Sequence, residues 1–158
     1  MNTSKINLSN VIFLDSYNVY LPWGINCEDA WKIGIPNFLN FPDDKTRIVW
    51  TSSVFSRLNC EILAYLPNNS KLDQVTLWPK VIDNSLKLRA LEQYNLFGSH
   101  LEALFGKPQE ISTEGTALKM TIKTWSIGKC TLQLYTGETM DEFTLLDIIK
   151  DKTPRFVS

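Results

Sequence analysis

The feature that most constrains the fold of this sequence is a pattern that occurs twice along the chain. Residues 55–60 and 125–130 both read aromatic-Ser-x-x-x-Cys, and an alternating run ending in tyrosine follows each cysteine. A turn and a further segment, 72–77 or 140–145, come next in the same order. Because alternation with a period of two is typical of strands, each copy predicts a β-hairpin followed by a third strand. We therefore interpret the chain as an internal duplication.

Glycine and proline mark a helix end before each hairpin. Gly34-Ile35-Pro36 and Gly106-Lys107-Pro108 share the arrangement in which glycine takes a positive φ and proline prevents the helix from continuing. They predict short helices over about 27–33 and 99–105. Apolar residues at helical spacing predict a longer helix over about 85–96.

Start signals accompany these helix ends. Asn26 is a suitable N-cap for the first short helix. Ser99 and Glu102 have the spacing of a capping box, which places the start of the other short helix beside Gly98. We expect Gly98 to separate this helix from the one before it, although one kinked helix also fits the pattern.

Six segments carry strand patterns, and the last of them is ambiguous. The segment 142–149 could also start a helix, and we let the repeat decide in favour of a strand. The predicted strands cover 47–55, 60–66, 74–78, 117–125, 130–135 and 142–149. The resulting prediction is a single α+β domain over residues 1–158, with helices packed on one face of an antiparallel sheet. It would consist of two pseudo-repeated α-β-β-β units, about 23–79 and 97–149.

Charge and apolar patterning restrict the partners. Sixteen Lys+Arg against seventeen Asp+Glu give a formal net charge of -1, which argues against nucleic acid as a partner. Apolar runs such as Val11–Leu14 are far shorter than the roughly 18 residues of a membrane span. Since no segment is typical of an export signal, we expect no membrane contact and a cytoplasmic location. Three cysteines without a CxxC pair agree with a reducing compartment.

The sequence carries no pattern that indicates catalysis. His100 is the only histidine, and we interpret it as a solvated helix residue rather than part of a catalytic triad. Cys60 and Cys130 fall among apolar residues, which favours small core side chains over metal ligands. We therefore expect a protein that is not an enzyme and that uses neither a metal nor a cofactor.

The alternation also divides the aromatic residues between the two faces of the sheet. If Cys60, Ile62, Leu118, Met120 and Ile122 face the helices, several aromatics face away together with lysines. Interfaces are enriched in Tyr and Trp, so this outer face is the expected partner-binding surface. Its candidate residues are Phe55, Tyr65, Trp78, Lys119, Lys123, Trp125, Gln133 and Tyr135. A cover formed by residues 1–22, or by the other half, is the open alternative.

A short helix ending Gly-x-Pro, followed by a hairpin and a third strand, resembles the repeat of the β-lactamase inhibitor protein-like family. The residues that carry the resemblance are Phe97-Gly98, Leu104–Pro108 and, more weakly, Trp23-Gly24 with Gly34–Pro36. The same unit is similar to small outer-membrane assembly lipoproteins. The resemblance, which covers about 23–149, implies that a sheet surface is presented to a protein partner. A cytoplasmic relative would look like an immunity protein, which neutralises a toxin delivered by neighbouring bacteria.

Our functional expectation is therefore a non-catalytic inhibitor whose partner is a cognate toxin domain. One alternative is a small-molecule-binding protein or an enzyme, with a cleft between the halves and with Glu61, Arg47, Asp73 and Asp141 as polar candidates. Another is a homo-oligomeric phage or accessory structural protein that uses the same face on itself.

Overall fold

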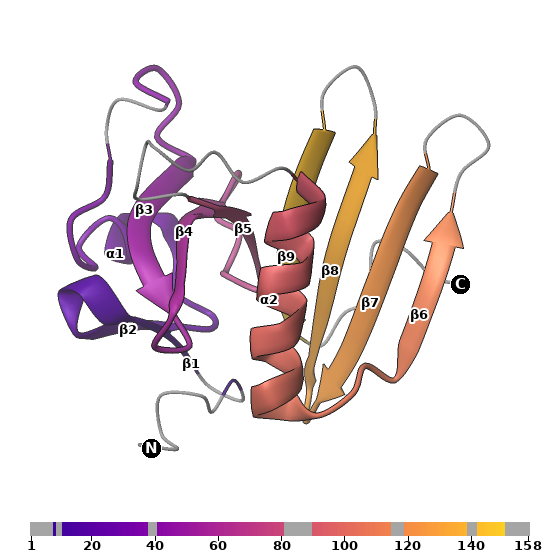
Figure 1. Ribbon diagram of the computed structural model, residues 1–158. Coiled ribbons are helices and arrows are strands. Elements are labelled where there is room, and N and C mark those ends of the chain that lie inside the picture. Colours follow the sequence, from indigo (N-terminus) through magenta and orange to yellow (C-terminus); the bar gives the residue numbers. More distant parts are fainter. Residues whose placement is uncertain are drawn as a thin grey trace.

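The computed structural model describes residues 8, 11–37, 41–80, 90–114, 119–138 and 142–150. Its main element is a seven-stranded sheet in which all neighbours are antiparallel (Figure 1). The order across it is β3-β4-β5-β9-β8-β7-β6. Its strands are β3 Arg47–Val54, β4 Leu58–Tyr65, β5 Gln74–Pro79, β6 Glu110–Glu114, β7 Lys119–Ile127, β8 Cys130–Glu138 and β9 Glu142–Lys150.

The other elements precede or cover this sheet. Strands β1 (Val11–Leu14) and β2 (Val19–Pro22) form a separate hairpin around a short 3-10 turn, Asp15–Tyr17. Helix α1 spans Cys27–Ala30, and helix α2 spans Ala90–Phe105. The α+β class with a mainly antiparallel sheet agrees with the sequence prediction.

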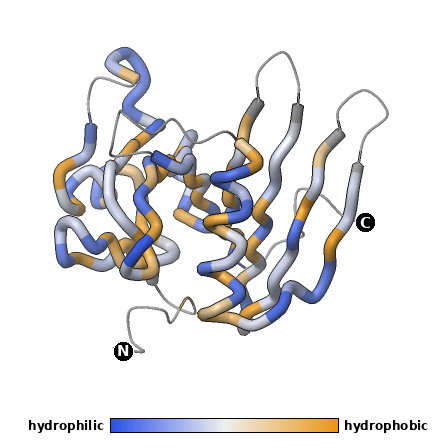
Figure 2. Tube along the Cα trace, viewed as in Figure 1, coloured by the Kyte–Doolittle hydropathy of each residue, from blue (hydrophilic) through white to orange (hydrophobic). Residues whose placement is uncertain are grey.

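One face of the sheet carries the hydrophobic core. Strand register places five fully buried residues in a row across it: Trp50, Ile62, Leu77, Leu146 and Leu134. Helix α2 packs over β7–β9, and the β1–β2 hairpin contributes to the same cluster beside β3. Figure 2 shows hydrophobic residues along α2 and along strands of both halves. A single core therefore joins the two halves on one side of the sheet.

The first helix agrees with its start signal but is shorter than expected. The Asn26 side chain accepts a hydrogen bond from the Asp29 amide at 2.8 Å, as predicted for an N-cap. The helix ends at Ala30 rather than near residue 33, and Gly34 has a positive φ of 57°. The predicted glycine stop thus lies after a further turn that is no longer α-helical.

Helix α2 corrects the two-helix prediction, because it runs through Gly98 without a break. Ser99 and Glu102 consequently lie inside the helix instead of forming a capping box at its start. A Cβ at Gly98 would lie 3.3 Å from the Lys123 Nζ and 3.6 Å from the Leu134 Cδ2, so glycine permits close packing on β7 and β8. Gly106, with a φ of 82°, ends the helix as predicted. The expected helical residues 85–89 lie outside the described part of the chain.

The six predicted strands are present, apart from residues 117–118, which lie outside the described ranges. The ambiguous segment is strand β9, and Cys60 and Cys130 are both buried, as expected. The residue-by-residue equivalence of the two copies is not confirmed. Phe55 lies in a turn closed by the pair Val54–Leu58, whereas Trp125 lies within β7 opposite Leu132.

The later strand shows the same mismatch between the aligned copies. Leu77 belongs to the core, but its aligned counterpart Leu145 pairs with Tyr135 on the opposite face. Register differences of an odd number of residues exchange the two faces of a strand, and turns of different length create such differences. The second half also contains an additional edge strand, β6.

Core truncations on both halves should be costly. Ile62 and Leu132 are fully buried, so Ile62→Ala and Leu132→Ala should each lower the free energy of unfolding by about 2–5 kcal/mol. Denaturant unfolding followed by tryptophan fluorescence measures this. A loss below about 0.5 kcal/mol in either variant would contradict the assignment of the core face.

Candidate functional site

The face opposite the core carries a groove of about 660 Å³ over strands β3–β5. We call it the outer groove. Alternation explains its position, because Ile62, Ala64 and Leu77 enter the core and their neighbours in β4 and β5 point the other way. Its lining includes Phe41, Arg47, Tyr65, Asp73, Thr76 and Trp78.

Arg47 is held between two aromatic rings at one end of the outer groove. Its guanidinium carbon lies 5.2 Å from the centroid of Phe41 and 5.2 Å from that of Tyr65, within cation–π range. Its Nε lies 3.5 Å from a carboxylate oxygen of Asp44. Hydrogen bonds from the hydroxyl and amide of Thr46 lower the pKa of Asp44, which keeps that carboxylate ionised beside the arginine. The groove thus has an oriented cation before any partner binds.

Tyr65 and Trp78 are the two predicted partner-binding residues that line this groove. Tyr65 is 54% exposed, and Trp78 is half-buried. Trp78 lies opposite Glu61 in the sheet, and Glu61 lies 3.7 Å from the Lys80 ammonium. These two aromatics face away from the helices, in agreement with the predicted alternation.

For three of the predicted residues, the face assignment is wrong. Phe55 is buried and packs edge-on against Phe105 of α2, with ring centroids 5.6 Å apart. Trp125 is fully buried, and its indole N–H donates to the Gly106 carbonyl at 2.9 Å. Lys123 also faces α2. For Lys123 and Trp125 the error arose in β7, where residues 123 and 125, rather than 120 and 122, share the side of Leu134 and Leu132.

Lys123 stabilises the packing of α2 rather than an open surface. Its ammonium lies 5.0 Å from the ring centroid of Tyr94 and 3.9 Å from a carboxylate oxygen of Glu102. Burial and the negative charge of Glu102 raise the pKa of Tyr94 to about 12, so the phenol stays neutral under the lysine. Lys119 lies in β7, and its side chain is outside the described part of the structure.

Gln133 and Tyr135 face away from the helices as predicted, yet both are buried. Tyr135 donates a hydrogen bond to Asp147 at 3.2 Å, and Thr76 donates to the other carboxylate oxygen at 2.7 Å. Asp147 is itself fully buried. Thr76, Asp147 and Tyr135 thus form a polar cluster. Thr76 lines the outer groove, and Asp147 lies opposite it in the neighbouring strand β9.

Asp147 is a residue that the sequence reasoning missed. The available signal was a single acid inside the apolar run Leu145-Leu146-Asp147-Ile148-Ile149. An ionisable group buried at such a position requires hydrogen-bond partners, and those partners come from β5 and β8. Sequence order alone did not show which strands would flank β9.

The polar residues named for a cleft between the halves are brought together only in part. Arg47 and Asp73 line the outer groove, which lies over β3–β5 rather than between the halves. Glu61 faces the same side beside Trp78, and Asp141 lies outside the described residues. His100 lies within α2, with its Nε2 2.9 Å from the Phe55 carbonyl oxygen, so it is not a solvated residue of a first turn.

The ranges that the structure describes hold neither a metal-binding cluster nor a membrane-spanning helix. There, no group of three or more His, Cys, Asp or Glu is placed to hold a metal ion. No helix in that part of the chain is both long and apolar enough to cross a bilayer. The cysteines form no disulfide, and burial raises the pKa of the Cys60 thiol.

No protein-family model, curated protein or solved structure matches this chain. The class that the fold defines is an α+β protein with one sheet face in the core and a groove of aromatic and cationic residues on the other. The resemblance to the β-lactamase inhibitor protein-like family stays a prediction.

Proposed function

We propose that this protein is a non-catalytic inhibitor that binds another protein through the outer groove. In its most specific form it is a cytoplasmic immunity protein that neutralises a bacterial toxin. The observation that carries the proposal is the meeting of Arg47, Tyr65 and Trp78 in one groove. Arg, Tyr and Trp are the residue types most enriched among side chains that dominate binding energy in protein interfaces.

Side chains of the outer groove are held in place before a partner binds, which favours tight binding. Arg47 is fixed by two rings and by Asp44, so a partner would not have to immobilise it. Tyr65 keeps more than half of its surface available for burial. Burying rigid aromatic side chains gives large contact area at low cost in conformational entropy.

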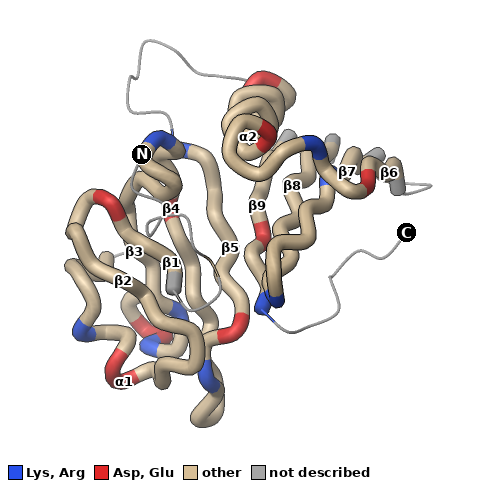
Figure 3. Tube along the Cα trace, turned by 90° about the horizontal axis from the view of Figure 1, so that it is seen from below, with Lys and Arg blue, Asp and Glu red and all other residues tan. Residues whose placement is uncertain are grey.

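The charge distribution limits the kind of toxin that we propose as the partner. The net charge is -1, and Figure 3 shows acidic and basic residues interspersed along the chain. Inhibitors that associate rapidly with strongly basic nucleases need a complementary acidic surface. A toxin domain without a strong positive charge is therefore the better match.

We propose the internal duplication only for the order of the strands. The central pair of the sheet is β5 and β9. From this pair, the strand order is β5-β4-β3 toward one edge and β9-β8-β7 toward the other. Such an arrangement is what two copies of a three-stranded unit joined side by side would give, and an α-helix precedes each set in the chain. Conserved register is not part of the proposal.

Truncating the two groove aromatics should weaken partner binding. Tyr65→Ala and Trp78→Ala should each weaken binding by about 30-fold or more, as expected for anchor residues. The measurement is co-expression pull-down with the product of the adjacent gene, followed by titration calorimetry of the purified pair. Tyr20, which is 44% exposed on β2, supplies the matched control Tyr20→Ala, and its affinity should match wild type.

Circular dichroism must first show that each variant is folded. Unchanged affinity in both folded groove variants would reject the outer groove as the contact surface. Turnover of a substrate by the purified chain, with no partner captured, would reject the inhibitor proposal as a whole.

A further inference from the structure

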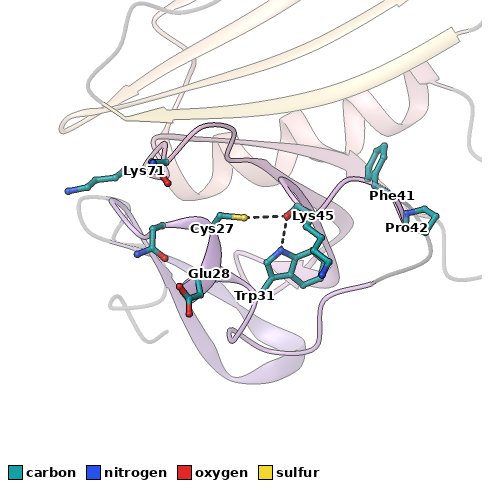
Figure 4. A pocket seen from close by; sticks show the side chains of 9 residues that line it. Cys27, Glu28, Trp31, Phe41, Pro42, Lys45 and Lys71 are labelled. Atoms are coloured by element: carbon teal, nitrogen blue, oxygen red, sulfur yellow. Dashed lines mark hydrogen bonds between the residues drawn. The ribbon is translucent and has the colours of Figure 1, made fainter.

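A second and larger cavity, of about 1040 Å³, lies beside helix α1. We call it the α1 cavity. It shares Phe41 and Lys71 with the outer groove, but its other walls come from α1, Trp31 and the loop around Lys45 (Figure 4). Its volume is at the upper end of the range of about 300–1,000 Å³ that is usual for ligand sites.

Hydrogen bonds tie the walls of the α1 cavity to one another. The Lys45 carbonyl accepts from the Trp31 indole N–H at 2.7 Å and from the Cys27 thiol at 3.3 Å, and Figure 4 shows both side chains directed at it. Backbone bonds of 2.8 Å and 2.9 Å connect Leu72, next to Lys71, with Gly24 and Ile25. The cavity is therefore formed in advance, which lowers the entropic cost of binding.

The apolar part of the lining is flat. Trp31, Phe41 and Pro42 supply ring surfaces, and the only polar atom of the Trp31 side chain is already used on Lys45. These walls therefore offer dispersion and π contacts, which a flat ring system fills better than a branched chain.

The charged part of the lining selects for an anion. Lys45 and Lys71 are exposed at the cavity, and neither forms an ion pair within the ranges that the structure describes. Glu28 is the one acidic residue among the lining residues. The rim therefore has an excess of positive charge that a ligand can neutralise.

We infer that the α1 cavity is a binding site for a small organic anion with a flat apolar body. The ring system packs on Trp31 and Phe41, and the positive charge of Lys45 and Lys71 at the rim attracts the anionic group. This inference does not depend on the proposed protein partner, because the cavity walls are complete within one chain.

The test uses anilinonaphthalene sulfonate, a fluorescent anion with a flat naphthalene ring, and its neutral parent N-phenylnaphthylamine. The sulfonate should bind wild type at one site per chain and about tenfold more tightly than the parent, an advantage that added salt reduces. Lys45→Gln combined with Lys71→Gln should weaken sulfonate binding by about tenfold and leave the parent unaffected. Both affinities come from fluorescence titration.

The control removes the same charge elsewhere. Lys107→Gln combined with Lys129→Gln changes two exposed lysines of the other half and should bind the sulfonate like wild type. Equal affinity for the sulfonate and its neutral parent would overturn the inference, as would wild-type affinity in the Lys45/Lys71 double variant. Neither outcome would bear on partner binding through Tyr65 and Trp78.

Discussion

Replacing Trp125 with alanine should lower the free energy of unfolding by about 3–5 kcal/mol, the largest effect expected of any substitution considered. Trp125 is fully buried between β7 and α2, and its N–H is bonded to the Gly106 carbonyl that follows the helix. The substitution removes a large buried side chain and leaves that carbonyl without its donor. Denaturant unfolding with a far-ultraviolet circular dichroism readout gives the value.

Trp78→Ala is the matched control, because it removes the same side chain from the opposite face. Trp78 is half-buried at the outer groove, so its truncation should cost about 1–2 kcal/mol. Equal losses in the two variants would contradict the placement of Trp125 in the core. A larger loss for Trp78 would reverse the assignment of the two sheet faces.

Replacing Asp147 with alanine should cost about 3 kcal/mol of unfolding free energy. The side chain is fully buried, and two hydroxyl groups, those of Thr76 and Tyr135, donate to its two oxygens. Removing the carboxylate deprives both donors of this acceptor and leaves the buried Tyr135 hydroxyl without it. The same denaturant experiment measures the loss.

Two further variants separate the contributions at this cluster. Tyr135→Phe removes one hydrogen bond and should cost about 1 kcal/mol. Glu61→Ala removes a partly exposed carboxylate of the same sheet face, which lies 3.7 Å from the Lys80 ammonium, and should cost less than about 1 kcal/mol. If Asp147→Ala cost no more than Glu61→Ala, the buried carboxylate would have no structural role.

Strand positions were predictable because alternation is a local property of the sequence. The run from Cys130 to Tyr135 shows the period of two in its own residues, and β8 covers it. The signals for a helix start at Asn26 and a helix end at Gly106 were equally local, and the cap and the positive φ occur there as expected. The capping-box spacing at Ser99 was misleading, since packing of Gly98 on β7 and β8 favours continuation of the helix.

The site was less predictable, because it depends on which strands become neighbours. Alternation within β7 groups Lys123 with Trp125, but only the register with β8 shows that both lie on the side of Leu134 and Leu132. The turn at Phe55 has positive φ at Phe55 and Ser56, which residue type does not indicate. Tyr65 and Trp78 were assigned correctly because their neighbours Ala64 and Leu77 do enter the core.

The N-terminal segment was the least readable part of the sequence, and its position answers a question that the sequence left open. Leu14 and Leu21 of the β1–β2 hairpin are fully buried in the core cluster with Trp50. The Leu8 carbonyl accepts from the Cys130 thiol at 3.0 Å, on the core side of β8. The described part of the segment therefore covers the core face, and Tyr65 stays exposed on the other side.

Hydroxyl-radical footprinting of the complex with the adjacent gene product tests the central claim most directly. The claim is that the outer groove is the contact surface, and side-chain oxidation reports on that surface even where sheet amides already exchange slowly. Oxidation of Tyr65 and Trp78 should fall several-fold on binding, while Tyr20 on β2 should react as in the free protein. Unchanged oxidation of Tyr65 and Trp78, with protection appearing at Tyr20 or on α2 instead, would contradict it.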